Sequence, residues 1–373
     1  MPESPRLVDL VQSRLDAFLT ERGAELRGIS PDLDVVEESA RRFLQGGKRF
    51  RALFCYWGWR AVTAQGVEFD PLAEPEPESG LDAVVSIAAG LEMFHAAALV
   101  HDDIMDNSDL RRGQPSAHRA FARLHAERGW DGSADAYGLS AALLLGDLLL
   151  GWSDELVDAG VALAGEGPAG RATRLEFGRM RTEVTAGQYL DIFEEMAWRS
   201  LPEEELLSRA QRVVVYKSAK YSVEEPLAIG GTLADGSLAQ LAALRDFGLP
   251  LGIAFQLRDD LLGVFGDPDV TGKPAGDDLR EGKRTILVTL ARQKLPATAG
   301  RLFDELLGDR TLDAEQIGML QTAVRDSGAV EHVERLIAHQ LDQARAALAD
   351  APLARSARDE LTALADAVTR RAA

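Results

Sequence analysis

The chain has 373 residues, 46% of them hydrophobic, and a formal net charge of −19 from 41 Lys and Arg against 60 Asp and Glu. This length allows one large domain or two ordinary ones. The acidity argues against nucleic acid as the main partner, because a phosphate backbone attracts a basic face. The one cysteine, Cys55, excludes an internal disulfide and fits a reducing cytoplasm.

Helical periodicity dominates, with Ala, Leu, Glu and Arg abundant and few β-branched runs. The pattern predicts helices, in chain order, over Leu7–Arg22, Leu33–Leu44, Phe50–Ala64, Leu81–His101, Arg119–Arg128, Leu139–Leu163, Thr173–Trp198, Pro202–Tyr216, Ala239–Val264, Thr285–Gln293, Arg301–Leu307 and Ala314–Ala349, with a last helix to Arg371. The acidic, Pro-rich stretch Gly66–Gly80 is predicted to be an exposed loop. We expect a single-domain, all-α bundle over residues 1–373, with more than ten helices around one or two apolar central ones.

The most apolar stretch is Leu139–Trp152, which Asp147 interrupts. No apolar run reaches the roughly 18 residues that a membrane span needs, and the first residues lack the basic-then-apolar pattern of a signal peptide. The sequence therefore predicts a soluble, cytoplasmic protein without stable membrane insertion. It also predicts that Leu139–Trp152 lies in a buried core helix.

Three carboxylates, Asp102, Asp103 and Asp106, follow an apolar run, and two arginines follow them. In a helix, Asp102 and Asp106 lie at i and i+4 and point from one face, where like charges repel. A hard divalent cation with oxygen ligands, Mg²⁺ above all, would relieve this repulsion. The alternative is a solvated acidic turn at a helix end. The apolar lead-in favours carboxylates at the edge of a core.

A second acid pair, Asp259 and Asp260, follows another apolar helical run and precedes a loop rich in Gly, Lys and Arg. Two acid pairs, each followed by basic residues, suggest metal ions that bridge a polyphosphate. The carboxylates would hold the metals, the metals the phosphate oxygens, and the basic side chains would neutralise the remaining charge.

At this point the chain resembles the trans-type isoprenyl diphosphate synthases, the polyprenyl synthetase family. The matching stretches occur in the family's order and are GGKRFR at Gly46–Arg51, DDIMD at Asp102–Asp106 with RR following, KSAKY at Lys217–Tyr221, and FQLRDD at Phe255–Asp260. The resemblance implies an isoprenoid-synthase-type helical bundle, a homodimer, and three Mg²⁺ ions per active site. The implied metal ligands are Asp102, Asp103, Asp106, Asp259 and Asp260.

The resemblance also implies which residues bind isopentenyl diphosphate. Lys48 and Arg51 follow a Gly-Gly break and would clamp its diphosphate, joined by His95 and Arg112, while Arg111 would contact the allylic diphosphate. From the residues alone, ordinary surface charge at Lys48 and Arg51 and a satisfied core histidine at His95 stay open as alternatives.

The remaining motifs are expected to act on the allylic substrate. Lys217 would anchor the departing diphosphate, and Ser218 and Gln256 would aim dipoles at the carbocation that ionisation leaves. Gln188 and Asp191 resemble a family element that faces the same cavity, with a polar helix stripe as the alternative. Two loop lysines would cap the diphosphate, and a neighbouring arginine is a weaker candidate: Lys273, Lys283 and Arg284.

Product length is expected to depend on the residues just before Asp102. The family positions that form the floor under a short product are Ala98 and Ala97 here, which are too small to block a growing chain. Phe94 lies one helical turn deeper, ~5.4 Å away. A lower floor favours geranylgeranyl diphosphate over farnesyl diphosphate.

One departure concerns the second motif, in which family members commonly carry a third Asp where this chain has Gly263. Asp267 could substitute only if the helix extends that far before Pro268. The departure puts the occupancy of one metal in question, not the class of reaction.

The sequence thus predicts a Mg²⁺-dependent prenyltransferase that condenses isopentenyl diphosphate head-to-tail with an allylic diphosphate (dimethylallyl, geranyl or farnesyl). Alternatives are a farnesyl or longer-chain synthase, a non-catalytic subunit of a heteromeric synthase, a terpene cyclase, and a structural bundle with incidental acid clusters. Lys48, Arg51 and His95 argue against a cyclase, which needs no isopentenyl site. Two retained acidic motifs argue against a non-catalytic subunit.

Overall fold

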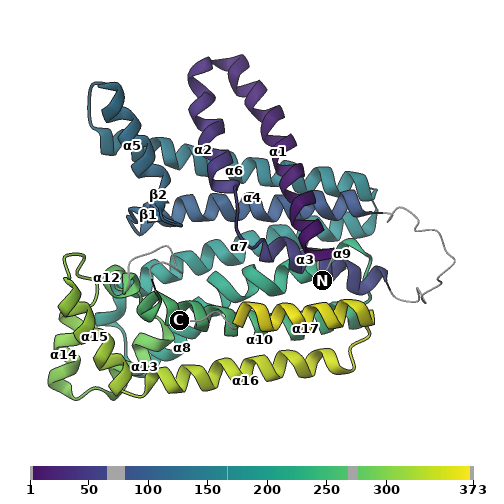
Figure 1. Cartoon of the computed structure of the whole chain (residues 1–373). Helices are drawn as coiled ribbons and strands as arrows, with labels where there is room; N and C mark the ends of the chain where they lie inside the picture. Colours follow the sequence, from purple (N-terminus) through teal and green to yellow (C-terminus); the bar gives the residue numbers. More distant parts are fainter. Residues whose placement is uncertain (1–2, 65–79, 166, 268–275, 370–373) are drawn as a thin grey trace. The chain divides into compact units, whose positions relative to one another are not determined.

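The computed structural model describes residues 3–64, 80–165, 167–267 and 276–369. The predicted loop Gly66–Gly80, apart from its last residue, lies outside the described residues, as do Lys273 and the predicted helix end at Arg371. The described residues are almost entirely helical, which confirms the all-α class (Figure 1). They form two compact units, Met1–Leu175 with Ile229–Gly236, and Glu176–Ala228 with Ser237–Ala373. That the whole chain acts as one domain stays a prediction.

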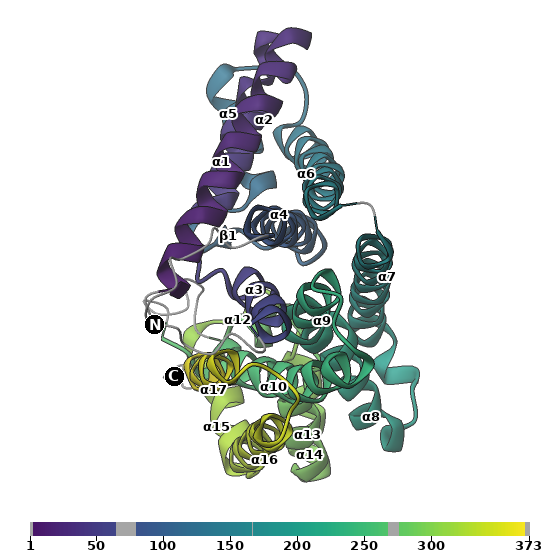
Figure 2. The ribbon, with the colours of Figure 1, turned by 90° about the vertical axis from the view of Figure 1, so that its right-hand side faces the viewer.

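The first unit is built around one apolar helix. Its elements are α1 (Glu3–Ile29), η1 (Pro31–Leu33), α2 (Asp34–Leu44), α3 (Phe50–Thr63), α4 (Leu81–Met105), the two-residue strands β1 (Leu110–Arg111) and β2 (Gln114–Pro115), α5 (Ala117–Arg128), α6 (Ala134–Ala164) and the start of α7 (Pro168–Ala197). Of the most apolar window of α4, 83% is buried, so this helix forms the core. Helices α4 and α6 run side by side (Figures 1 and 2).

Glycines let α4 and α6 approach closely. A Cβ at Gly90 of α4 would lie 2.7 Å from a methyl carbon of Val157, and one at Gly160 of α6 would lie 2.7 Å from the Ala83 carbonyl oxygen. Neither position has room for a side chain, because real Cβ atoms do not approach other atoms so closely. This packing holds α4, whose C-terminal end carries the first acidic motif, against α6.

The second unit is built around α10 (Leu238–Phe265), which begins with a capping box at Ser237 and Gln240. Helices α16 and α17 pack against α10 (Figures 1 and 2). The π-helical segment η3 also packs against α10. The elements of this unit, besides the rest of α7, are η2 (Trp198–Ser200), α8 (Glu203–Val213), η3 (Val214–Glu224), α9 (Glu225–Leu233, whose end belongs to the first unit), α12 (Asp277–Glu281), α13 (Ile286–Lys294), α14 (Ala297–Leu306), α15 (Ala314–Asp326), α16 (Ala329–Ala349) and α17 (Arg355–Thr369).

The prediction that Leu139–Trp152 lies in a buried core helix was wrong for one side of that helix. The segment is helical, but Leu139, Leu143 and Leu144 on one side of α6 are about half exposed, while Leu145 and Leu149 are buried. Composition reports only how apolar a segment is, and a helix can present an apolar face to solvent or to a partner.

The prediction of one helix over Ala314–Ala349 was also wrong, because the chain breaks there at Gly328. This residue has φ 76°, a left-handed conformation that glycine adopts at little cost and that ends α15 before α16 starts. The lysine motif lies on η3, a π-helix that helical periodicity could not distinguish from an α-helix.

The expectation about membrane spans needs correction as well. Three described helices, α4, α6 and α10, are long and apolar enough to cross a membrane by length and composition. The expectation counted only uninterrupted apolar runs, whereas these helices keep a high mean hydropathy despite a few charged residues. In α4 that apolar surface is used for the core of the unit.

Candidate active site

The first acidic motif ends α4. Asp102 lies in the last helical turn, and Asp106 caps the helix with its backbone N–H donating to the Asp102 carbonyl at 2.8 Å. The expected i and i+4 relation is therefore present, with both carboxylates on one face. A helix C-terminus carries partial negative charge, so carboxylates there are destabilised and favour a bound cation.

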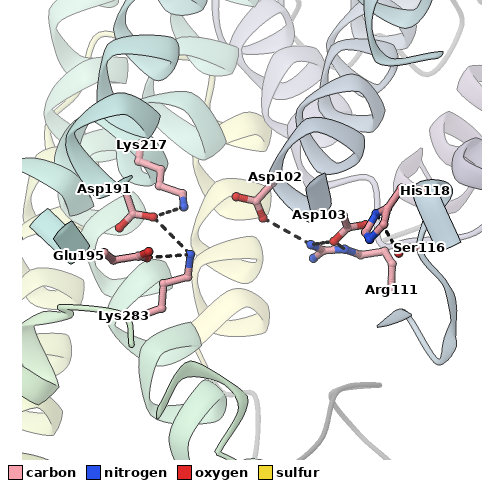
Figure 3. A network of polar contacts seen from close by, with 9 residues as sticks. All are labelled: Asp102, Asp103, Arg111, Ser116, His118, Asp191, Glu195, Lys217 and Lys283. Atoms are coloured by element: carbon pink, nitrogen blue, oxygen red, sulfur yellow. Dashed lines mark hydrogen bonds and ion pairs between the residues drawn. The ribbon is translucent and has the colours of Figure 1, made fainter. Parts of the chain in front are cut away.

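Arg111 compensates part of this charge from within the protein. Its Nε donates to Asp103 Oδ1 at 2.9 Å, its Nη2 contacts the same oxygen, and Nη2 also lies 3.4 Å from Asp102 Oδ2 (Figure 3). Asp103 is fully buried. The structure thus places Arg111 against two of the predicted metal ligands and gives Asp103 a guanidinium partner.

A buried ion pair that the sequence did not predict holds the Gly-Gly turn before α3. Arg49, in the left-handed conformation at φ 50°, lies 3.2 Å from Glu92 of α4 and donates to Gln12 at 2.6 Å. The other Glu92 oxygen accepts from the Ala52 N–H at 3.1 Å. Because α3 is tied to α4 in this way, Lys48 and Arg51 on either side of Arg49 have fixed backbone positions. The signal was the second basic residue of GGKRFR, to which no role was assigned.

The structure gathers four arginines around His95. Burial, followed by the charges of Arg51, Arg112, Arg111 and Arg49, lowers the pKa of His95 well below its ordinary value. The imidazole is therefore neutral at pH 7 and can donate one hydrogen bond without adding charge. Arg49 and Arg111 are paired with Glu92 and Asp103, and guanidinium groups gathered in this way suit a diphosphate.

Arg112 belongs to this set by contact as well as by charge. Its guanidinium packs on Gly47, where a Cβ would lie 3.3 Å from Nη2, and Nη1 lies 3.4 Å from the Gln45 carbonyl. Burial is the largest cause that lowers the pKa of Arg112, followed by the charge of Arg49. Gly47 therefore provides the space in which Arg112 reaches the turn that carries Lys48. Lys48 itself is exposed, with Nζ 5.9 Å from the centre of the Phe50 ring.

The three residues predicted to control product length lie on α4 as expected. Phe94 and Ala97 are buried, and Ala98 is partly exposed. Phe94 and Ala98 stand one turn apart on the same face.

The second acidic motif lies near the C-terminal end of α10. Asp259 is exposed, whereas Asp260 is 4% exposed and accepts a hydrogen bond from Gln256 Nε2 on Oδ1 at 2.7 Å. Burial, together with the charges of Asp259 and Asp191, raises the pKa of Asp260 to about 7, although the Gln256 hydrogen bond and Lys217 act against it. Gln256 is thus directed at the acid pair, in addition to any role toward a carbocation.

Two lysines from distant parts of the second unit meet at one carboxylate. Lys217 Nζ lies 2.5 Å from Asp191 Oδ2, and Lys283 Nζ lies 3.5 Å from the same oxygen and 3.2 Å from Glu195 Oε1 (Figure 3). The sequence predicted both lysines and Asp191 but missed Glu195, which stands one turn after Asp191 on α7. In the sequence, the spacing of four residues between Asp191 and Glu195 was the signal that both side chains lie on one face of the helix.

The other predicted residues of this unit are placed less specifically. Gln188 and Ser218 are partly buried. Gly187, beside Gln188, packs directly on the backbone of Lys217, because a Cβ added at Gly187 would lie 2.4 Å from the Lys217 nitrogen. Arg284 turns to another neighbour, because its guanidinium lies 3.7 Å from the centre of the Trp198 ring. Burial lowers the pKa of Arg284 to about 10.

The condition under which Asp267 could complete the second motif is not met. Helix α10 ends at Phe265, and Gly266 is extended with ψ 148°. Asp267 is exposed beyond this end and is out of helical register with Asp259.

The acid pairs fit divalent cations that also bind substrate oxygens. Among the described residues, no three Asp, Glu, His or Cys side chains converge into a ready cage. Mg²⁺ uses one or two carboxylates together with substrate phosphates and water, so an incomplete protein cage is what such sites require. In the second motif, Asp260 Oδ2 is buried without a hydrogen-bond partner, and a buried oxygen of this kind suits a ligand cation.

Carboxylate pairs at helix ends, with arginines and lysines gathered nearby, define a helical enzyme of the kind that handles organic diphosphates. Comparisons with known proteins agree. The polyprenyl synthetase family model matches residues 34–324. Geranylgeranyl diphosphate synthase of Mycobacterium tuberculosis is 30% identical over 93% of this chain and 86% of its own, and geranylfarnesyl diphosphate synthase of Aeropyrum pernix is 30% identical over 82% and 84%.

A solved structure of geranylgeranyl pyrophosphate synthase from Corynebacterium glutamicum, complexed with isoprenyl diphosphate and magnesium, is 36% identical. It aligns with a TM-score of 0.89 over 98% of this chain and 99% of its own. The chain belongs to the polyprenyl synthetase family and is an isoprenyl diphosphate synthase, a prenyltransferase.

Proposed function

We propose that the protein is a Mg²⁺-dependent geranylgeranyl diphosphate synthase that adds isopentenyl diphosphate head-to-tail to an allylic diphosphate. The observation that carries this proposal is the set of four arginines around neutral His95, beside the first acidic motif. A terpene cyclase has no use for such a second diphosphate site. The names of the relatives, which include geranylgeranyl and geranylfarnesyl synthases, support a product longer than farnesyl diphosphate.

In the proposed reaction, the C–O bond of the allylic diphosphate breaks and its electron pair leaves with the diphosphate. When bound, Mg²⁺ neutralises the negative charge that develops on the leaving diphosphate. In the first motif, Asp102 and Asp106 would hold metal, and in the second motif Asp259 would do so. Lys217 and Lys283 would turn from Asp191 and Glu195 to the diphosphate oxygens, since charged groups already desolvated bind a new anion strongly.

The remaining steps join the two substrates. Ser218 and Gln256 present dipoles that stabilise the allylic carbocation. Lys48, Arg51 and Arg112 hold isopentenyl diphosphate by its diphosphate, with His95 as a neutral donor. The double bond of isopentenyl diphosphate attacks the cation, and the new cation then loses a proton to the released diphosphate.

The test of this function is an incubation with labelled isopentenyl diphosphate and dimethylallyl, geranyl or farnesyl diphosphate, with the products separated by chain length. We expect a C20 product with Mg²⁺ and no turnover when the metal is chelated. Full turnover in the presence of the chelator would contradict the metal requirement, and a C15 or C25 product would contradict the assigned length.

We also propose that the protein acts as a homodimer in which α6 packs against a second copy. Leu139, Leu143 and Leu144 leave an apolar strip exposed on this helix, and exposed strips of this kind favour association. Light scattering of the wild type should give the dimer mass, and Leu143→Glu with Leu144→Glu should give the monomer. Arg123→Glu, at an exposed arginine of α5, is the control for added charge. A monomeric wild type would contradict this proposal.

A further inference from the structure

The place of the missing third carboxylate in the second motif is occupied from elsewhere in the chain. A Cβ added at Gly263 of α10 would lie 2.0 Å from Asp278 Oδ2, 2.3 Å from its Cγ and 2.8 Å from its Oδ1. All three distances are shorter than real Cβ contacts, so the Asp278 carboxylate stands where a side chain at position 263 would begin. Glycine at this position is what makes room for it.

The short helix α12 holds Asp278 in this place. Left-handed glycines bound the helix on both sides, Gly276 with φ 72° and Gly282 with φ 81°. Leu279 is fully buried, and its carbonyl accepts from the Gly308 N–H at 2.9 Å. Asp278 is therefore attached to the body of the unit on both sides, although it comes from a different element than Asp259 and Asp260.

The backbone of Asp278 also connects this carboxylate to a residue of the diphosphate site. Its carbonyl oxygen accepts from the N–H groups of Gly282 and Lys283, both at 3.0 Å. The side chain of Lys283 reaches Asp191 and Glu195. One turn of the chain, from Asp278 to Lys283, thus positions both the carboxylate beside the second motif and the lysine that would cap the diphosphate.

The helical register places Asp278 next to the acid pair. Gly263 follows Asp259 by four residues, and Cβ atoms at this spacing are about 5–6 Å apart on one face. A carboxylate at the Gly263 position therefore lies one turn from Asp259, the distance over which two carboxylates can share ions and water. The other candidate, Asp267, stands beyond the end of α10 and lacks this relation.

We propose that Asp278 supplies the third carboxylate of the second metal-binding motif, in place of the aspartate that Gly263 lacks. This inference rests on the proposed function, in which a divalent cation binds at Asp259 and Asp260. It assigns Asp278 as a ligand of that cation, directly or through a bound water.

The test uses Mn²⁺ binding to the full-length protein with inorganic pyrophosphate present, measured by electron paramagnetic resonance without any substrate turnover. Asp278→Ala is expected to weaken one class of Mn²⁺ sites roughly tenfold or more. Asp277→Asn, in the same helix, is the matched control and should bind as the wild type does. Asp278→Asn keeps the shape of the side chain and serves if the alanine variant melts early by circular dichroism.

A swap makes the test specific for position. Gly263→Asp alone should lower the melting temperature, because its Cβ overlaps the Asp278 carboxylate. Gly263→Asp combined with Asp278→Ala removes this overlap and should restore Mn²⁺ affinity toward the wild-type value. Wild-type-like Mn²⁺ binding by folded Asp278→Ala and Asp278→Asn would overturn the inference, as would a folded swap variant that stays weak.

Failure of the inference is distinguishable from failure of the proposed function. If the wild type binds no Mn²⁺ with pyrophosphate, the metal requirement itself is wrong, and Asp278 loses its assigned ligand. If the wild type binds Mn²⁺ and both Asp278 variants bind it equally well, the metal requirement stands and only the role of Asp278 is wrong.

Discussion

Both acidic motifs lie at the C-terminal ends of long apolar helices, α4 in one unit and α10 in the other, but their buried carboxylates have different partners. In the first, Asp103 is fully buried and bonded to Arg111. In the second, Asp260 is almost as buried, has an amide partner in Gln256, and has its pKa raised to about 7. The first motif neutralises its buried acid with a guanidinium, whereas in the second motif the charge of Lys217 only partly offsets the cost of burying Asp260.

Glu92 and Glu224 repeat this contrast. Glu92 in the first unit pairs with Arg49, whereas burial raises the pKa of Glu224 in the second unit to about 7, although the charge of Lys220 acts against it. A buried carboxylate without a cation is costly in its charged form. The comparison therefore teaches that the first motif is preorganised by arginine, while the second has more to gain from a bound metal.

The largest expected effect is on the first motif. Asp102→Ala removes a predicted metal ligand and should lower turnover roughly a hundredfold or more, since several kcal/mol of transition-state stabilisation would be lost. Steady-state rates at saturating Mg²⁺ measure this loss. Asp135→Asn, at an exposed acid of the same unit, is the control. Near-normal turnover of Asp102→Ala would contradict the assignment.

The next effect separates the two substrates. Arg51→Ala should raise the KM for isopentenyl diphosphate roughly tenfold or more, because a charge-assisted contact contributes about 1.5–3 kcal/mol. The KM for the allylic substrate should change little. Arg128→Ala, at an exposed arginine of α5, controls for loss of charge. An equal rise in both KM values would mean that the arginine cluster has a structural role only.

A smaller effect is expected on product length, which we predict to depend on residues of α4 in the first unit. Ala97→Phe should refill the upper turn of α4 and shift the product toward farnesyl diphosphate, while Phe94→Ala should lower the floor and lengthen the product. Chromatography of the products gives the distribution, and thermal unfolding checks that the fully buried Ala97 tolerates the larger ring. An unchanged distribution in both variants would place the floor on another helix.

The smallest effect tests Glu224, a buried acid of the second unit whose pKa is raised by burial. The folded-state pKa of Glu224 is raised to about 7 from its ordinary 4.5. Between pH 4.5 and about pH 7, the folded state therefore keeps a proton that the unfolded state has lost. The stability that this proton brings is complete below pH 4.5 and is lost as pH rises through about 7. Glu224→Gln should therefore change the free energy of unfolding, and this change should be roughly 1–2 kcal/mol more stabilising at pH 8 than at pH 5.

Urea unfolding at the two pH values measures this difference. Glu203→Gln, at an exposed glutamate of α8, is the control and should show the same small change at both. A Glu224→Gln effect that does not depend on pH would mean that the carboxylate keeps its ordinary pKa.

The sequence by itself determined the helices and the chemistry they carry. Apolar periodicity within α4 and α10 predicted both helices to within a few residues, and the order of motifs identified the family. These features are local, because a helical period and a motif are written in consecutive residues. Boundaries that depend on one residue, such as the break at Gly328, were less visible.

Only the tertiary structure decided which distant residues share a site. The Arg49–Glu92 pair, the two lysines at Asp191 and the Asp278 carboxylate at Gly263 each join different elements. Close packing selects such contacts through shape and burial, and no spacing along the chain encodes them. Gly263 shows the difference most directly, since in the sequence it is a missing carboxylate and in the folded unit it is the space that another carboxylate fills.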